Sequence, residues 1–128
     1  MPLFRTILFV KDMATMLAFY EELLGFKEIQ TPDTGPDWRV LDTGGAELAL
    51  HAVPARVARE LTISDPAEPR TNAVTKLVYA VDDVVAARGR LRQAGVLEVI
   101  HGGFELGEPP PFWDFQDPEG NLLQITSR

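Results

Sequence analysis

The sequence predicts an α+β domain made of two tandem β-α-β-β-β units. Three stretches of the first half reappear in the same order in the second half, as expected for an internal repeat. The matching stretches are FVKDM (9–13) with AVDDV (80–84), LLGFKEI (23–29) with QAGVLEV (93–99), and GGAELALH (44–51) with EGNLLQIT (119–126). We therefore predict a single domain over residues 1–128, with repeat units at 1–53 and 74–128 and a connector at 54–73.

The first unit begins with a strand and a helix. Residues 4–10 are rich in strand-forming side chains, and Asp12 stands where a helix N-cap is expected. Apolar residues recur every three or four positions over 14–24, which predicts a helix that ends at Gly25. Three short strands follow, separated by turns that contain proline and glycine. These strands are expected at 26–30, 38–41 and 47–53.

The second unit repeats this pattern after the connector. Residues 54–72 hold three prolines and lack strand character, so we expect at most one short helix there. Asp82 and Asp83 precede an amphipathic stretch that ends near Gly95. The final hairpin turns at DPEGN (117–121), which is turn chemistry. The predicted elements are strands at 76–81, 97–100, 112–115 and 122–125, and a helix at 84–93.

Composition excludes several classes of function. The formal net charge of -7 argues against nucleic-acid binding, which depends on clustered Lys and Arg. An acidic surface can attract a cationic small molecule or simply keep the protein soluble, and both interpretations remain open. The chain has no cysteine, so it has neither disulfides nor thiolate metal ligands.

Nothing in the sequence predicts a membrane protein. No apolar run approaches the length of a bilayer span. The N-terminal apolar stretch is interrupted early by Arg5, Lys11 and Asp12, which does not fit a secretory signal. We therefore predict a soluble, cytoplasmic protein.

Four motifs resemble the vicinal oxygen chelate superfamily, which includes glyoxalase I, extradiol dioxygenases, and fosfomycin and bleomycin resistance proteins. The motifs are the first strand with Asp12, AFYEELLGF (18–26), VDDV (81–84) and DPEGNLLQI (117–125). The resemblance implies that the two units form an eight-stranded, cup-shaped mixed sheet, often completed by a second subunit. We therefore expect a homodimer, formed either by intact chains or by swapped units.

The resemblance also implies where a metal would be held. Metalloenzymes of this group bind a divalent ion such as Mn, Fe, Ni or Zn through four side chains, usually His, Glu, His and Glu. The corresponding positions here are Arg5, Ala49, Lys76 and Gln124. Arginine and lysine are cationic donors that repel a metal ion. We therefore predict no metal and no cofactor.

One alternative metal site remains open. His51 and His101 are the only histidines, and either could combine with Glu47 or Glu105. Two histidines and a carboxylate can hold iron, manganese or zinc. Against this, neither histidine stands at a position where the family places a ligand. His51 then reads as an ordinary strand residue and His101 as a loop residue.

Without a metal, the cup is expected to bind an aromatic small molecule. The aromatic candidates are Phe9, Trp38, Phe112, Trp113 and Phe115, and the stretch FELGEPPPFWDF (104–115) resembles the aromatic segment of bleomycin resistance proteins. Arg5 and Lys76 would suit a carboxylate, phenolate or quinone oxygen, with His51, Ala49 and Gln124 nearby. Trp38 and Trp113 could equally be core residues. Pro109–Pro111 could form a rigid rim or an edge-protecting loop.

We predict a metal-independent binding protein of the bleomycin resistance type that sequesters an aromatic natural product or drug. The alternative is a lyase, isomerase or dioxygenase of the same fold. Such an enzyme would use an atypical metal at His51, or Lys76 as an acid-base group. A third possibility is an interaction module whose cup is filled by its own side chains.

Overall fold

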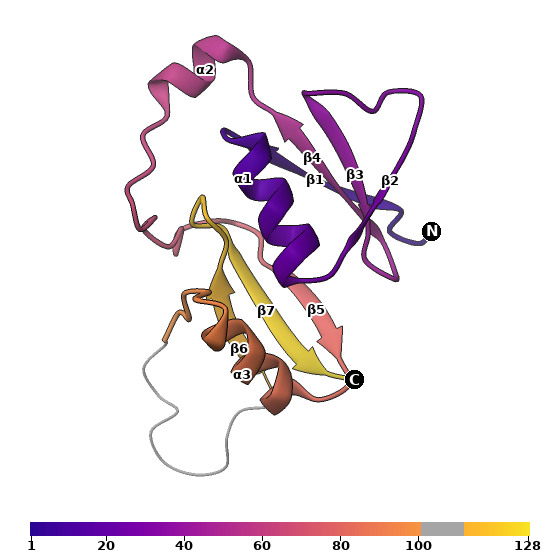
Figure 1. Ribbon diagram of the computed structural model, residues 1–128, viewed down its shortest axis with the longest axis vertical. Helices are drawn as coiled ribbons and strands as arrows, with labels where there is room; N and C mark the ends of the chain where they lie inside the picture. Colours follow the sequence, from indigo (N-terminus) through magenta and orange to yellow (C-terminus); the bar gives the residue numbers. More distant parts are fainter. Residues whose placement is uncertain (101–111) are drawn as a thin grey trace. The chain divides into compact units, whose positions relative to one another are not determined.

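The computed structural model describes residues 1–100 and 112–128 (Figure 1). Within it, the chain forms two compact units, Met1–Ile63 and Ser64–Arg128. Each unit contains one copy of the predicted repeat, and the units are described separately below. None of the described helices is both long enough and apolar enough to span a membrane.

The first unit is a four-stranded mixed sheet with a helical segment on one face (Figure 1). Its strands are β1 (Arg5–Val10), β2 (Lys27–Ile29), β3 (Trp38–Asp42) and β4 (Glu47–Ala52). The strand order is β1-β4-β3-β2, with β1 parallel to β4 and the other pairs antiparallel. All four strands were predicted from the sequence, with ends that differ by one or two residues.

The helical segment of this unit differs from the prediction in its second half. Helix α1 (Met13–Ala18) continues directly as η1 (Phe19–Leu23), which is a π-helix. The backbone N–H of Leu24 donates to the carbonyl oxygen of Phe19, five residues earlier. The wider turn is compatible with the same apolar periodicity, so the side-chain pattern could not distinguish it from an α-helix.

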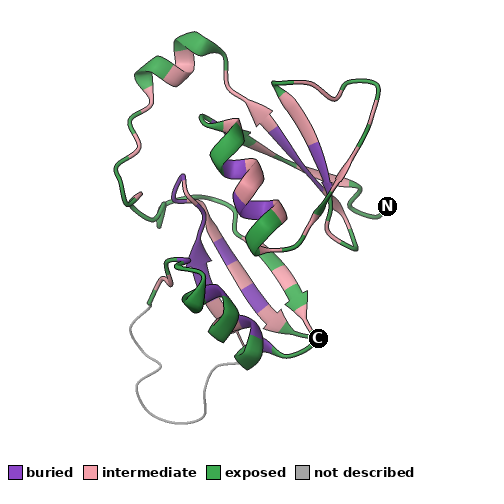
Figure 2. Ribbon diagram, viewed as in Figure 1, coloured by how far each residue is buried: buried purple, intermediate pink, exposed green. Residues whose placement is uncertain are grey.

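The core of the first unit lies between α1 and the sheet. Side chains alternate between the two faces of a strand, so Leu48 and Leu50 of β4 point to the same side. Both are buried, as are Met16 and Tyr20 of the helical segment (Figure 2). The opposite face of the sheet therefore carries the alternate residues of each strand, and several predicted site residues are among them.

The second unit has the same topology. Its strands are β5 (Leu77–Val81), β6 (Phe112–Gln116) and β7 (Leu122–Ser127), in the order β5-β7-β6. Strand β5 is parallel to β7, as β1 is to β4, and β6 is antiparallel to β7. Helix α3 (Val84–Gln93) covers one face and buries Ala87 and Leu91. The α+β class and the repeated unit are therefore confirmed.

The strand predicted at 97–100 is too long, because the structure has only one bridging residue there. The structure gives a single bridge between Glu98 and Phe115, supported by hydrogen bonds from Val99 N–H to Asp114 and from Gln116 N–H to Leu97. The described residues therefore form sheets of four and three strands in place of a complete set of eight.

Matching aspartates begin the main helix of each unit. The carboxylate of Asp12 accepts from the N–H of Thr15, and that of Asp83 accepts from the N–H of Ala86. These contacts satisfy backbone donors that the first helical turn leaves free. Hydrogen bonds from the backbone and the hydroxyl of Thr15 lower the pKa of Asp12. The predicted N-caps are therefore confirmed in both units.

The connector contributes to both units. Helix α2 (Ala55–Glu60) is the single short helix that was expected, and it lies in the first unit. The part that follows packs on the final turn of the second unit. Arg70 donates through its backbone N–H to Gly120 at 2.8 Å and through Nε to the carbonyl of Glu119 at 3.1 Å. The later part of the connector therefore makes an ordered contact with the β6–β7 turn through Arg70.

Candidate functional site

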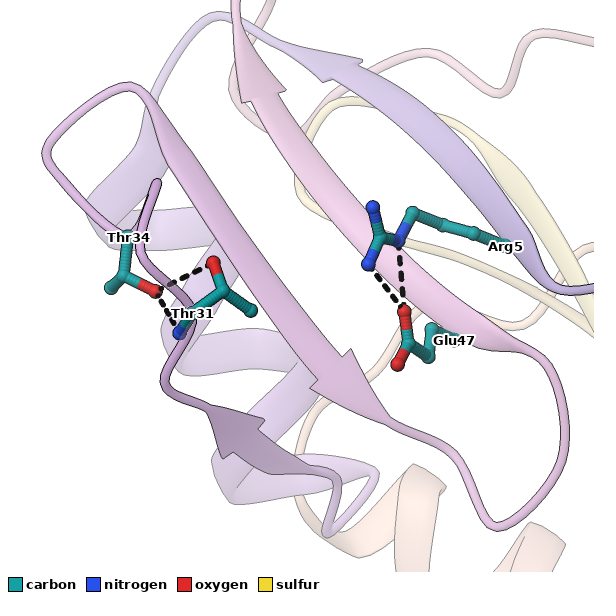
Figure 3. Close-up of polar contacts among 4 residues, drawn as sticks. All are labelled: Arg5, Thr31, Thr34 and Glu47. Atoms are coloured by element: carbon teal, nitrogen blue, oxygen red, sulfur yellow. Dashed lines mark hydrogen bonds and ion pairs between the residues drawn. The ribbon is translucent and has the colours of Figure 1, made fainter.

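An ion pair lies on the face of the first sheet that is turned away from α1 (Figure 3). Arg5 on β1 and Glu47 on β4 are direct partners in the parallel register. The Nε and Nη2 atoms of Arg5 donate to one carboxylate oxygen of Glu47, at 2.8 and 2.6 Å. Both side chains are partly exposed. The guanidinium at this position, where the resemblance implies a metal ligand, is therefore already paired with a carboxylate.

Three aromatic side chains continue this face along the same strands, and we call Phe9, Trp38 and His51 the aromatic face. His51 is the register partner of Phe9 on one side and of Trp38 on the other. Its ring centroid lies 5.5 Å from that of Phe9 and 5.3 Å from that of Trp38. The ring planes of Phe9 and His51 are inclined to each other by 33°, whereas the rings of Trp38 and His51 meet edge to face. Phe9 is 63% exposed, so this face offers apolar surface to a ligand.

Arg5 also contacts the aromatic face. Its guanidinium carbon lies 5.6 Å from the centroid of the Trp38 ring and 5.0 Å from that of Phe4. These distances are within the range of cation-π attraction. Ala49, at the fourth predicted position, pairs with Ile7 and Val40 and is completely buried. It forms part of the floor beneath the larger side chains.

The loop before β3 fixes the position of Trp38. Thr31 N–H donates to the hydroxyl of Thr34 at 2.8 Å and closes the turn after β2 (Figure 3). Gly35 and Trp38 then exchange backbone hydrogen bonds. The Nε atom of Arg39 donates to the carbonyl of Gly35 at 2.9 Å. Trp38 is therefore held at the start of its strand by an ordered loop.

The second unit carries a buried carboxylate beside its two predicted site residues. Asp114 on β6 is 3% exposed. Its two oxygens accept from Lys76 Nζ and from Gln124 Nε2, each at 2.8 Å. Gln124 is the direct cross-strand partner of Asp114. The two predicted positions of this unit, Lys76 and Gln124, are thus brought together by a residue that was not predicted.

The role of Asp114 could have been predicted in part from the sequence. Residues 112, 114 and 116 of a strand share one face, so the aspartate in FWDFQ had to lie beside Phe112 and Gln116. A charged residue between aromatic neighbours in a closing strand requires a partner when it is buried. Lys76 was the available cation, seven residues before the capping Asp83.

Trp113 lies on the other face of this sheet. The guanidinium carbon of Arg88, on α3, is 3.4 Å from the centroid of the Trp113 ring. Arg88 in turn donates to Glu98 at 2.8 Å. The indole N–H of Trp113 is buried and has no acceptor among the residues that the structure describes. Trp113 therefore packs against α3, whereas Phe112 shares a face with Asp114.

One titratable residue of the second unit is strongly perturbed. Burial raises the pKa of Tyr79, and the negative charge of Asp117 raises it further. Both effects disfavour the phenolate form. His101, Glu105 and Pro109–Pro111, which the sequence suggested as further candidates, lie outside the described residues.

The donor chemistry at the expected ligand positions does not fit a divalent metal. Two of the four positions hold cations, and each cation is bound by a neighbouring carboxylate. Among residues 1–100 and 112–128, no three side chains of His, Cys, Asp or Glu are grouped closely enough to hold a metal ion. A metal bound at these positions would have to displace Arg5 and Lys76 from their partners.

Comparison with known proteins gives one family for the whole chain. The model of the Glyoxalase/Bleomycin resistance protein/Dioxygenase superfamily matches residues 3–125. A search of curated proteins gave no significant match. The sequence-based resemblance and the family match therefore agree.

Several solved structures share the fold at low sequence identity. A family enzyme from Burkholderia phytofirmans PsJN is 24% identical, with a TM-score of 0.69 over 99% of this chain and 98% of its own. The bleomycin resistance determinant of transposon Tn5 is 22% identical, with a TM-score of 0.62 over 97% and 95% of the two chains. Glyoxalase I of Leishmania major is 19% identical, with a TM-score of 0.72 over 99% and 86%. These similarities show the fold alone.

Proposed function

The chain belongs to the Glyoxalase/Bleomycin resistance protein/Dioxygenase superfamily, and on this basis we propose that it is a metal-independent small-molecule-binding protein. In this proposal it sequesters an aromatic natural product or drug, in a resistance role. The observation that carries the proposal is that Arg5 and Lys76, at positions where the resemblance implies metal ligands, are each paired with a carboxylate.

The charge balance supports binding without a metal. A guanidinium and an ammonium cannot donate electron pairs to a metal ion while they are protonated. Glu47 and Asp114 are the nearest carboxylates, but each already compensates one of these cations. Recruiting either carboxylate to a metal would leave a partly buried cation without its partner, which is unfavourable.

The aromatic face supports an aromatic ligand. Phe9 and His51 are inclined to each other by 33°, and Phe9 is largely exposed, so a flat ring can stack there. The proposed ligand-binding residues remain those expected from the sequence. They are Arg5, Phe9, Trp38, Ala49, His51, Lys76, Phe112, Trp113 and Gln124.

The proposal includes a homodimer in the cytoplasm. Members of this superfamily often act as dimers. Strand β1 stands at the edge of its sheet and β5 at the edge of the other, and a sheet edge can pair with a second chain. The apolar side chains of Phe4 and Ile7, in and next to β1, are substantially exposed. This exposed apolar surface supports contact with a second copy of the chain.

Elemental analysis of the purified protein tests the proposed function. The protein is prepared without chelator and analysed again after incubation with Mn, Fe, Ni or Zn and removal of free ions. We expect markedly substoichiometric metal in every sample. Stoichiometric, tightly held metal would contradict the proposal, and its loss in His51→Ala would place an atypical metal site at that residue.

A further inference from the structure

We propose that the aromatic face of the first unit selects planar aromatic ligands that carry an anionic oxygen, and that Arg5 receives this oxygen. The inference rests on the proposed function, because it names the ligand class of the same binding protein. It is carried by the placement of one cation over Trp38 and beside Glu47.

The position of Arg5 disfavours a cationic ligand. Exposed aromatic rings next to a carboxylate would ordinarily attract an ammonium group. Here the guanidinium of Arg5 already lies over Trp38 and already pairs with Glu47. A cationic ligand would therefore meet a like charge at the ring and would compete with Arg5 for the carboxylate.

The geometry of Arg5 leaves donors for a ligand. A guanidinium carries five N–H groups in a planar fork. Two of its hydrogen bonds go to a single oxygen of Glu47, so three N–H groups remain outside that ion pair. A carboxylate or phenolate can accept from them without displacing Glu47.

The ring of the ligand has a neighbouring surface on which to stack. Phe9 and His51 are register partners on adjacent strands. Trp38 contacts the other side of the His51 ring, edge to face. These side chains and Arg5 all project from the same face of β1, β4 and β3. A planar ligand can therefore contact the aromatic face and Arg5 at the same time.

The net charge of -7 would favour a cationic ligand, but this charge is spread over the chain and acts over a longer range. Charges separated by more than about 8 Å are largely screened at physiological ionic strength. A ligand oxygen in contact with Arg5 would be screened much less. Because Glu47 offsets part of the charge of Arg5, we expect selection for an anion of about tenfold.

Ring-matched probes test this selection directly. Anthracene-9-carboxylate, anthracene-9-carboxamide and 9-(aminomethyl)anthracene present the same ring with negative, neutral and positive substituents. Their binding to the full chain is measured by the fluorescence anisotropy of the anthracene. We expect the carboxylate to bind about tenfold more tightly than the ammonium compound, with the amide between them.

Substitutions locate the selection at Arg5. In Arg5→Gln the preference for the carboxylate is expected to disappear, whereas Arg5→Lys should retain part of it. Arg92→Gln is the control, because it removes the same kind of charge from an ion pair of the second unit, with Glu98. Arg92 lies on α3 and is not part of the aromatic face or of the loop that holds Trp38. Phe9→Leu should weaken all three probes alike.

Equal or tighter binding of the ammonium compound would overturn the inference, and so would an unchanged order of affinities in Arg5→Gln. Failure of all three probes to bind would overturn it as well. Thermal unfolding of each variant confirms that the fold is retained, and Arg5→Met, which also removes the charge, serves if Arg5→Gln does not fold. These failures leave the metal analysis untouched, so they are distinguishable from failure of the proposed function.

Discussion

Replacing Lys76 with methionine is expected to lower the free energy of unfolding by about 3 kcal/mol, because it removes the ammonium group that is paired with the buried carboxylate of Asp114. The side chain of Asp114 is 1% exposed, and Lys76 Nζ lies 2.8 Å from it. Gln124 would remain as a neutral donor, which cannot compensate the charge. Urea denaturation of the purified variant measures the change.

Arg5→Met is the matched control for this prediction. The Arg5–Glu47 pair also joins two strands of one sheet, in the other unit, but its side chains are 27% and 22% exposed. Its loss should lower the free energy of unfolding by at most about 1 kcal/mol. Adding Asp114→Leu to Lys76→Met should restore much of the stability. Equal effects of Lys76→Met and Arg5→Met would show that Asp114 does not depend on its cation.

Gly120→Ala is expected to lower the free energy of unfolding by about 3 kcal/mol. Gly120 has a φ of +85°, where an L side chain is strained, and a Cβ there would overlap the backbone carbonyl of Glu68. Relief would require the connector to move away from the β6–β7 turn, with loss of the Arg70 hydrogen bond to Gly120. Thermal and urea unfolding both report this change.

Gly95→Ala separates the two causes. Gly95 has a similar φ of +82°, but among the described residues, apart from its chain neighbours, no atom lies within 4 Å of the position of its Cβ. This substitution should therefore show only the backbone strain, about 1 to 2 kcal/mol. The larger effect at Gly120 would measure the contact with the connector. If both variants lost the same stability, the packing of residues 66–70 on the turn would not contribute.

The repeat made most of the fold predictable. Matching FVKDM with AVDDV placed Asp12 and Asp83 at equivalent helix starts, and both are N-caps. Short hydrogen-bonding side chains at these positions act within one turn of the backbone, so a local pattern is enough to identify them. The parallel pairing of β1 with β4 and of β5 with β7 then follows from having the same unit twice.

The candidate site was less predictable because its contacts depend on cross-strand register. The sequence selected Lys76 and Gln124, but only the pairing of β6 with β7 places Asp114 between them. Trp113 was predicted to contact a ligand, and that prediction stays open. Its ring, however, lies under Arg88 on the α3 side. A shift of one residue along a strand reverses the face of a side chain, and the sequence alone did not determine that face.

Binding of anthracene-9-carboxylate to metal-depleted protein tests the central claim most directly. The protein is treated with a chelator, freed of it, and titrated by fluorescence anisotropy before and after addition of Mn, Fe, Ni or Zn. Metal-independent binding predicts saturable binding with the same Kd in every sample. Binding that is lost on depletion and restored by one of these metals would contradict it.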